Sequence, residues 1–363
     1  MEPLLQLVHV SDLHFRQRHG PSPVGARSVG QRTPSRDSVF QGMEGHDPQA
    51  LGPLVRSIRD RVGPSRSAFR HGTFLVVTGD LATLGDAGSA ESAERLVADI
   101  AAQAGLPAPL VVYGNHDVWP GSLPLFAGAD ADLDARRSAL RAKPLHAADR
   151  PARALQAGPF SLWYLDTVRH GRFENTLALG HIGADRYWEK DRQLRPQLDA
   201  LAAAATQSEL RIALTHHPVL QPSRWRPWKG LRNWAEMERG LSAADPAGGR
   251  HRLVRVVLSG HTHALYPPLG RLRADIATRN ARQVHAQLVV GTATQLRHGD
   301  HQGTVEADLE QHHCWQLLRF FEEPEGRLVL ERIVFVRSGS VVPLYAPATI
   351  GADPRRTAER AYL

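Results

Sequence analysis

The feature that most constrains the fold of this chain is a series of short apolar runs, most of which end in a polar cluster. Short runs that are rich in Val, Ile and Leu are typical of buried strands that deliver functional residues at their carboxyl ends. We expect strands near residues 4–10, 73–78, 109–113, 160–167, 210–215, 253–258, 286–290, 313–321 and 327–336.

Helices are expected between several of these strands. Asp47 is suited to cap a helix whose first turn holds Pro48 and whose apolar face runs to Val62. Further helices are expected at about 89–104 and at about 184–204. The early strands therefore alternate with helices, whereas the last four strands follow one another with little helix between them. This order favours a mixed sheet, or two packed sheets with helices outside, over one doubly wound parallel sheet.

The composition is that of a folded protein and excludes several classes. The 363 residues, 42% hydrophobic and 22% charged, are enough for one large α/β domain or two smaller ones. A net charge of +7 attracts anions such as phosphates without marking a nucleic-acid binder. Cys314 is the single cysteine, which excludes an internal disulfide and a zinc site built from several cysteines. We find no secretion signal and no run of about 20 apolar residues, so we expect a cytoplasmic protein without a membrane span.

We expect a single domain over residues 1–337, with two insertions and a peripheral tail. Residues 16–46 hold many arginines and glycines and few apolar residues, which predicts a long loop that either covers a site as a lid or lies in solvent. Residues 118–158 are rich in Ala, Pro and Asp and have weak periodicity, so they are interpreted as an insertion. Residues 338–363 are interpreted as a C-terminal tail.

Five of the predicted strands end in residues that can bind metals. These residues are Asp12 and His14, Asp80, Asn115 with His116 and Asp117, His216 with His217, and His261 with His263. Each cluster alone has an ordinary explanation, such as a Gly-Asp turn, a helix cap or a histidine pair bonded to backbone carbonyls. Together they supply oxygen and nitrogen ligands that suit Mn, Fe, Zn or Ni. The sequence therefore predicts a metal site at the ends of the strands.

The order of these blocks, DLH, GD, GNHD, HH and GHTH, resembles the calcineurin-like metallophosphoesterase superfamily, and within it the bacterial cyclic-nucleotide phosphodiesterase branch. The resemblance runs from Asp12 to His263 and implies an α/β fold, a four-layer αββα sandwich of two mixed β-sheets with a dimetal site at strand carboxyl ends. It implies two divalent or transition metal ions per chain. The first would be held by Asp12, His14 and His263, the second by Asn115, His216 and His261, with Asp80 bridging the two.

His116 is left over from this ligand set, and the resemblance makes it the candidate catalytic residue that protonates the leaving oxygen or stabilises the transition state. In relatives that dephosphorylate proteins, an aspartate three residues beyond the bridging Asp orients this histidine, and here that position is Thr83. Those relatives also carry an arginine where this chain has Tyr113. Both departures argue against a protein Ser/Thr phosphatase, and they leave Asp117 or a backbone carbonyl to orient His116.

Substrate contacts must come from the rim of the site. Trp225 and Trp228 lie among basic residues after His217, and such a loop could stack a base and hold a phosphate. Alternatively these tryptophans pack under the loop or form a contact between subunits, because Trp is a favoured packing and interface residue. Arg16 is a further candidate for contact with the substrate. A homo-oligomer is compatible with the sequence.

The leading hypothesis is a metal-dependent phosphodiesterase that acts on a small nucleotide-type diester and uses a metal-bridging hydroxide as nucleophile. A phosphomonoesterase or nucleotide pyrophosphatase with the same metals is the alternative. The modest charge and the absence of a continuous basic stripe disfavour nucleic acid as the substrate. A non-catalytic scaffold is the hypothesis from another class, and the intact ligand set argues against it.

Overall fold

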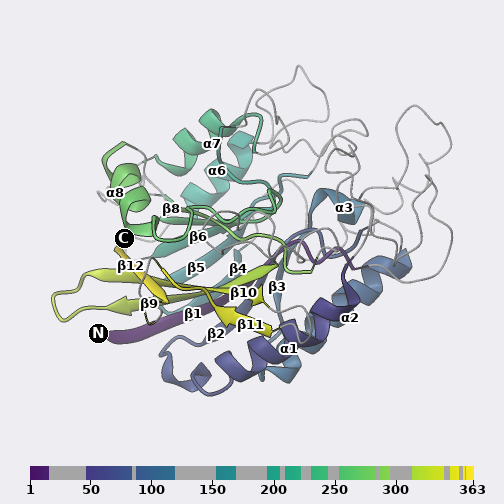
Figure 1. The fold of residues 1–363 in the computed structure, drawn as a ribbon. Helices are drawn as coiled ribbons and strands as arrows, with labels where there is room; N and C mark the ends of the chain where they lie inside the picture. The colour runs from purple at the N-terminus through teal and green to yellow at the C-terminus, as the bar shows by residue number, and fades with distance from the viewer. Residues whose placement is uncertain are drawn as a thin grey trace, which may run out of the picture.

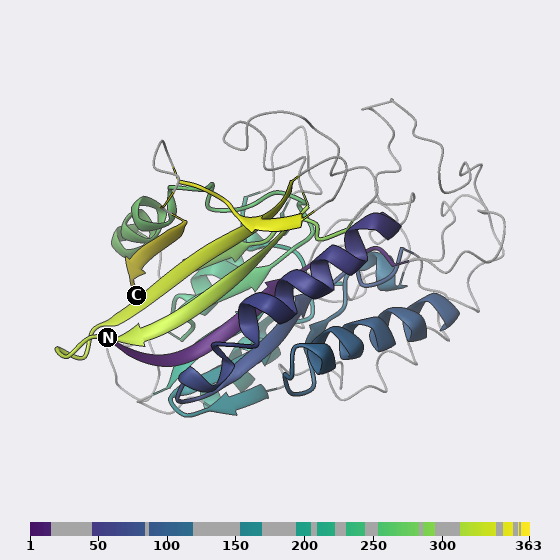
Figure 2. The same ribbon diagram turned by 60° about the horizontal axis from the view of Figure 1, so that its bottom comes forward.

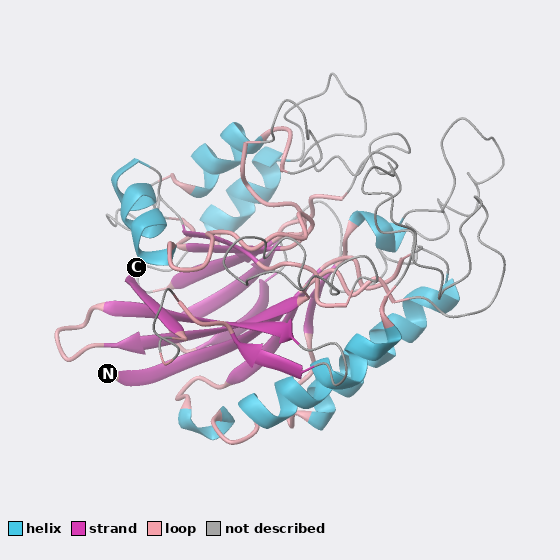
Figure 3. Cartoon of the chain, viewed as in Figure 1, coloured by secondary structure: helices cyan, strands magenta, loops and turns pink. Residues whose placement is uncertain are grey.

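The computed structural model describes residues 1–15, 46–83, 87–118, 153–168, 194–204, 209–221, 230–243, 253–282, 286–294, 313–338, 344–350, 355 and 357–363. Within these residues the chain forms two β-sheets that lie against each other, with helices on the outer sides (Figure 1). Figure 3 makes the separation plain, because the strands gather in the middle and the longer helices flank them.

The first sheet has seven strands in the order β11-β10-β9-β1-β2-β3, and β12 also pairs with β10. Its strands are β1 (Glu2–Val10), β2 (Thr73–Thr78), β3 (Leu110–Val112), β9 (Cys314–Glu322), β10 (Leu328–Ser338), β11 (Leu344–Pro347) and β12 (Ala358–Tyr362). Strands β1, β2 and β3 run parallel, whereas β9 pairs antiparallel with β1 and β10 pairs antiparallel with β9, β11 and β12. The sheet is therefore mixed.

The second sheet has five strands in the order β4-β5-β6-β7-β8. They are β4 (Arg153–Ala157), β5 (Phe160–Tyr164), β6 (Leu210–Leu214), β7 (Val256–Ser259) and β8 (Ala286–Val289). Strands β5 to β8 are parallel and β4 is antiparallel to β5, so this sheet is mixed as well. Parallel strands bring their carboxyl ends to the same edge, which fixes where loop residues of β6 and β7 can meet.

The helices are α1 (Pro48–Val62), η1 (Arg66–Ala68), α2 (Ala87–Gln103), α3 (Asn115–Val118), α6 (Leu194–Ala203), α7 (Trp234–Leu241) and α8 (Leu272–Arg282). The predicted cap of the first helix is confirmed, because the Asp47 side chain accepts a hydrogen bond from the backbone N–H of Gln49 at 2.8 Å. Figure 2 shows α1 and α2 lying across one outer face of the first sheet.

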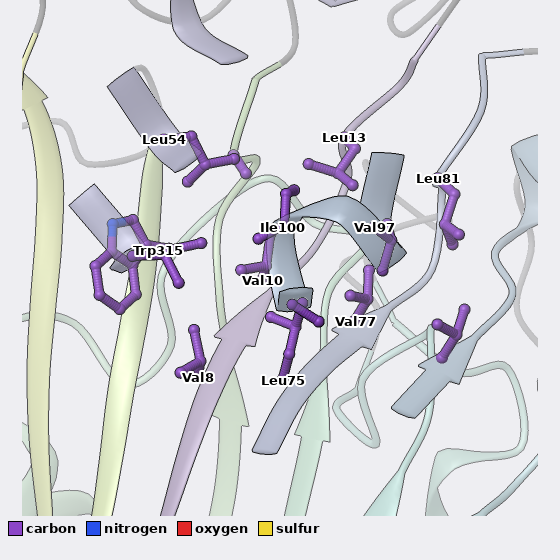
Figure 4. Close-up of a cluster of buried hydrophobic side chains, with 14 of the residues drawn as sticks. Val8, Val10, Leu13, Leu54, Leu75, Val77, Leu81, Val97, Ile100 and Trp315 are labelled. Carbon is purple, nitrogen blue, oxygen red and sulfur yellow. The ribbon is translucent and has the colours of Figure 1, made fainter. Parts of the chain in front are cut away.

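The alternation of side chains along β1 explains the layers. Leu5 and Leu7 point into the space between the two sheets, where they pack with strands of the second sheet. Val8 and Val10 point the other way and pack with residues of α1 and α2 (Figure 4). A third apolar cluster joins the far face of the second sheet to α6 and α7. The order of layers is therefore helix, sheet, sheet, helix, and the predicted αββα sandwich is confirmed.

Three short strands lie within the segments that the sequence analysis set apart as an insertion and a tail. Part of the expected tail at 338–363 belongs to the first sheet, because β11 and β12 both pair with β10. The expected insertion at 118–158 ends in β4, which pairs with β5. In both cases a short strand gains its hydrogen bonds at the edge of an existing sheet, and such a strand needs little apolar sequence of its own.

The expectation of little helix among the last strands is wrong, because α8 lies between β7 and β8. Of this helix, Leu272 and Ile276 are buried, and most of the remaining residues are polar or charged. Helix α7 was not expected either. Of the helix expected at 184–204, α6 is the described part. Among the described residues, no helix combines the length and the apolar composition that crossing a bilayer requires.

Candidate metal centre

The candidate ligands gather where five strands end. Asp12 and His14 follow β1, Asp80 follows β2, and Asn115 and His116 open α3 after β3. His216 follows β6 and His261 and His263 follow β7 in the other sheet. All seven predicted metal ligands lie in the described part of the chain, and the structure brings them into two adjoining clusters.

The first cluster contains Asp12, His14, Asp80 and His263. Nε2 of His263 lies 3.2 Å from Asp12 Oδ1 and 3.3 Å from Nε2 of His14. Nε2 of His14 lies 3.9 Å from Asp12 Oδ1 and 3.9 Å from Asp80 Oδ2. Four side chains from three loops thus direct one ligand atom each to a common point.

The second cluster is centred on Nε2 of His216. This atom lies 3.0 Å from Asn115 Oδ1, 3.1 Å from His261 Nδ1 and 3.4 Å from Asp80 Oδ2. Because Asp80 Oδ2 also faces His14, one carboxylate oxygen belongs to both clusters. The other oxygen of Asp80, Oδ1, accepts the backbone N–H of His116 at 2.8 Å.

These spacings fit metal ions. Ligand atoms held at about 2.0–2.2 Å from one cation lie about 3.0–3.5 Å from each other, and most of the distances in both clusters fall in or near that range. Asp12 Oδ1 is buried 3.2 Å from His263 Nε2 and has no hydrogen-bond partner among the residues that the structure describes. Oδ2 of the same residue accepts the backbone N–H of His261 at 3.0 Å. Asp12 and Asp80 are therefore each anchored through one oxygen and offer the other to a cation.

The backbone at the ligands adopts a conformation that side chains normally avoid. Positive φ angles occur at Asp12 (53°), His14 (49°), Asp80 (49°), His261 (69°) and His263 (56°), and at no other non-glycine residue that the structure describes. Such angles cost free energy for any residue with a Cβ atom, and they cluster at functional sites because the surrounding fold enforces them.

Two glycines make room for this geometry. Gly79 has a φ of 101°, and a Cβ atom there would collide with the His216 ring. A Cβ atom at Gly114 would collide with the Asp80 carboxylate. The glycines in the GD and GNHD blocks are thus required by close approach to ligands on neighbouring strands.

The electrostatics of the centre favour cations. Burial raises the pKa of Asp12, but the interactions with His263 and His216 together outweigh burial and lower this pKa to about 2. Burial lowers the pKa of His14 and of His261 to about 3, so both rings are neutral at pH 7. Burial would also lower the pKa of His216, but the Asp80 and Asp12 carboxylates outweigh it and raise this pKa to about 9. The ionised carboxylates and the neutral rings of His14 and His261 suit a divalent ion, which would take the place of the proton that His216 carries at pH 7.

His116 stands beside the clusters, with its ring centre 4.8 Å from that of His14 in an edge-to-face arrangement. Its Nδ1 lies 3.0 Å from the backbone carbonyl oxygen of Thr83. Asp117, the other candidate to orient His116, instead accepts the backbone N–H groups of Ala82 and Gly114 at 2.9 and 2.7 Å. Of the two alternatives left open by the sequence, the carbonyl is therefore the partner.

Sequence reasoning left several residues without a role. His217 is buried and forms a group with His216 and His261 whose ligand-capable atoms lie within 4.8 Å of one another. Its Nδ1 lies 3.0 Å from Thr167 Oγ1. The adjacent histidines in the HH block were a signal for this, whereas nothing in the sequence singled out Thr167. Trp225, Trp228 and Arg16, the predicted substrate contacts, lie outside the described residues.

Comparison with known proteins agrees with this geometry. A model of the calcineurin-like phosphoesterase family matches residues 5–265, which is more than half of the chain. The match begins in β1 and ends two residues beyond His263, so it contains every strand end that contributes to the two clusters. No curated protein matches the chain. The extent of the family match, over a sandwich that presents two His/Asp clusters at its strand ends, means that the chain belongs to the calcineurin-like phosphoesterase family.

Proposed function

We propose that this member of the family is a dimetal phosphodiesterase that hydrolyses a small nucleotide-type diester, with cyclic nucleotides as the leading substrate class. The observation that carries the proposal is the position of Asp80 Oδ2, 3.9 Å from His14 Nε2 and 3.4 Å from His216 Nε2. A single carboxylate oxygen that faces two ligand clusters can serve a pair of neighbouring cations.

The residues divide between the two ions as follows. Asp12, His14 and His263 would hold the first ion, Asn115, His216 and His261 would hold the second, and Asp80 would contribute to both. When bound, two such ions polarise the phosphoryl group and lower the pKa of a bound water, which is the chemistry that they supply to phosphoester hydrolysis. Asn115 adds a ligand without adding negative charge that would repel the substrate.

His116 is proposed to serve the leaving group. Because a carbonyl oxygen can only accept a hydrogen bond, Nδ1 of His116 donates to Thr83, and Nε2 is the atom that exchanges a proton. Its backbone N–H is fixed to Asp80 Oδ1, so the ring has a defined place relative to the residue that the two clusters share. A proton from Nε2 to the departing oxygen would then lower the barrier to cleavage.

A diester is favoured over a monoester by the side chains at positions 113 and 83, neither of which is cationic. Tyr113, at the position where protein phosphatases carry an arginine, is buried, and its hydroxyl lies 2.6 Å from Glu94 Oε1. The Thr83 hydroxyl donates to the backbone carbonyl of His14 at 2.6 Å. Neither position supplies a cation for the second negative charge that a phosphomonoester carries, whereas a diester has only one such charge to neutralise.

The test uses the full chain, stripped of metal and reconstituted separately with Mn, Fe, Zn and Ni. Each form is assayed against cyclic nucleotides, bis-nitrophenyl phosphate, nitrophenyl phosphate and a nucleotide pyrophosphate. We expect metal-dependent turnover, with the cyclic nucleotides and the aryl diester preferred over the monoester. A preference for the monoester or the pyrophosphate would replace the diester proposal by its alternative. Normal metal content without turnover of any substrate would favour a scaffold.

A further inference from the structure

A buried chain of hydrogen bonds lies against His216. Nδ1 of His216 is 2.8 Å from the backbone carbonyl oxygen of Thr78. The same carbonyl oxygen accepts a hydrogen bond from Ser11 Oγ at 3.1 Å. Because a carbonyl oxygen only accepts, Nδ1 carries a proton, and the lone pair of the neutral ring is on Nε2. That nitrogen is the one that faces Asn115 and Asp80. The Thr78 carbonyl therefore determines which nitrogen His216 offers to a ligand.

The side chain of Thr78 is held in turn by His9. Nε2 of His9 lies 2.9 Å from Thr78 Oγ1, and Nδ1 of His9 lies 2.8 Å from the side-chain nitrogen of Gln316. An amide nitrogen only donates, so His9 accepts at Nδ1 and donates from Nε2 to Thr78. The three residues are fully buried. Gln316 of β9 thus donates to His9 of β1, and His9 donates to Thr78 of β2. The Thr78 carbonyl in turn accepts a hydrogen bond from His216, which follows β6 of the second sheet.

The position of His9 would ordinarily suit an apolar residue. Leu5 and Leu7 occupy the same face of β1 in the layer between the sheets. A buried imidazole costs free energy unless its polar atoms are bonded, and burial lowers the pKa of His9 to about 3, which keeps the ring neutral. A leucine would extend the apolar layer at lower cost. What the histidine adds here is the pair of hydrogen bonds.

We infer that His9 is a positioning residue for the metal subsite formed by Asn115, His216 and His261. By holding Thr78, His9 keeps the Thr78 carbonyl aligned with His216 Nδ1, and so keeps His216 Nε2 directed at the ion. The inference rests on the proposed role of His216 as a ligand. Loss of a group that orients a ligating histidine typically lowers metal affinity about 10–100-fold.

The experiment measures metal affinity directly by competition with a chromophoric zinc chelator. Wild-type protein is expected to bind two equivalents of zinc. His9→Leu should weaken one equivalent about 10–100-fold and change the other far less. The matched control is Gln6→Leu, which removes another buried polar side chain from β1, one that contacts Ser65, Thr73 and Arg319. This control should lose stability and keep both affinities.

Two further variants separate positioning from folding. In His9→Gln the side-chain nitrogen of the amide can still donate to Thr78, so this variant should restore the weakened equivalent to within a few-fold of wild type. Thr78→Val removes the hydroxyl and retains both the carbonyl and the shape, so it should weaken the same equivalent. If His9 acts through Thr78, the double variant should be no weaker than the poorer of the two single variants.

Each result decides one question. A wild-type chain that binds fewer than two zinc ions overturns the dimetal proposal, and the inference about His9 with it. A wild-type chain that binds two ions, with His9→Leu and Gln6→Leu indistinguishable in affinity, overturns only the inference. If His9→Leu does not fold, unchanged affinities in Thr78→Val have the same meaning.

Discussion

The backbone carbonyl oxygen of Thr83 lies 3.0 Å from Nδ1 of His116, so a neutral group orients the histidine that stands beside the metal ligands. The carbonyl fixes the ring and its tautomer without bringing a second negative charge close to the place where a phosphate would bind. This contact separates the chain from relatives that use an aspartate at position 83, and it ties His116 to the same loop as Asp80.

Replacement of His116 by alanine should preserve the metals and reduce turnover. Loss of a general acid typically costs about 10²–10⁴-fold in rate, and His116 does not belong to either ligand cluster. The loss should be large for a cyclic nucleotide, whose alkoxide leaving group needs a proton, and small for an aryl diester with a good leaving group. Rates on both substrates and metal content by elemental analysis check this. Near-normal turnover of the cyclic nucleotide by a metal-replete variant would remove His116 from the mechanism.

Asp80 and Asn115 should differ in how many ions they control. Asp80→Ala should reduce the zinc content of the reconstituted protein by more than one equivalent, because Asp80 Oδ2 faces both His14 and His216. Asn115→Ala should lose only the equivalent that His216 and His261 hold. Zinc is counted after gel filtration, and replacement of His71, which lies away from the clusters, serves as the control. Equal losses in the two variants would mean that Asp80 is not shared.

The buried imidazole of His9 should make the fold sensitive to acid. Its pKa in the folded protein is lowered to about 3, because burial outweighs the attraction of Asp12, whereas an unfolded histidine titrates near 6.5. Below pH 6.5 the unfolded chain therefore takes up a proton that the folded chain refuses. The free energy of unfolding should fall as the pH drops from about 6.5 towards 3, by up to about 1.4 kcal/mol per pH unit.

The His9→Gln variant isolates the contribution of His9 to the pH dependence of the free energy of unfolding, because glutamine at position 9 does not titrate. Urea unfolding of both proteins at several pH values should give curves that separate below pH 6.5, with the wild type losing more stability. Parallel curves would mean that His9 becomes protonated in the folded state.

Trp225 and Trp228 test the nucleotide preference. If they stack a base, the double variant Trp225→Ala/Trp228→Ala should weaken binding of a nucleotide diester by the ~1–3 kcal/mol that stacking contributes per base. The KM for that substrate should rise accordingly. An aryl diester without a base should change far less. If both substrates suffer equally and the melting temperature drops, the tryptophans support the fold. If neither substrate is affected, the loop has no part in recognition.

The sequence was most informative where a strand and a ligand meet. Asp12, Asp80 and His261 each follow an apolar run closely, so both the strand and the function of its end could be predicted. The distances inside the clusters could not, because they depend on the relative placement of two sheets. The partner of His116 could not be predicted either, since a backbone carbonyl leaves no trace in the choice of side chain.

Elements that are stabilised by contacts between distant segments could not be predicted from the sequence either. Arg332 is fully buried and donates to Glu359 and to the backbone carbonyls of Pro267 and Pro268. Glu359 lies in β12 and also accepts the backbone N–H of Leu272 at the start of α8. The last strand and this helix are thus stabilised by a buried ion pair between distant segments. Of these residues, Glu359 belongs to the segment that the sequence analysis interpreted as a C-terminal tail.

Five of the metal ligands have positive φ angles, so the backbone conformation that the metal centre needs lowers the stability of the fold. Glycine adopts positive φ without penalty, so a glycine in place of His14 or His263 would relieve local strain of about 1–2 kcal/mol while removing a metal ligand. Directed evolution of this chain for thermal stability alone would therefore tend to erase its active centre, and a stabilised variant should be screened for metal content before its melting temperature is trusted. Conversely, grafting these side chains onto another sandwich would fail unless the host turned its strand ends in the same way.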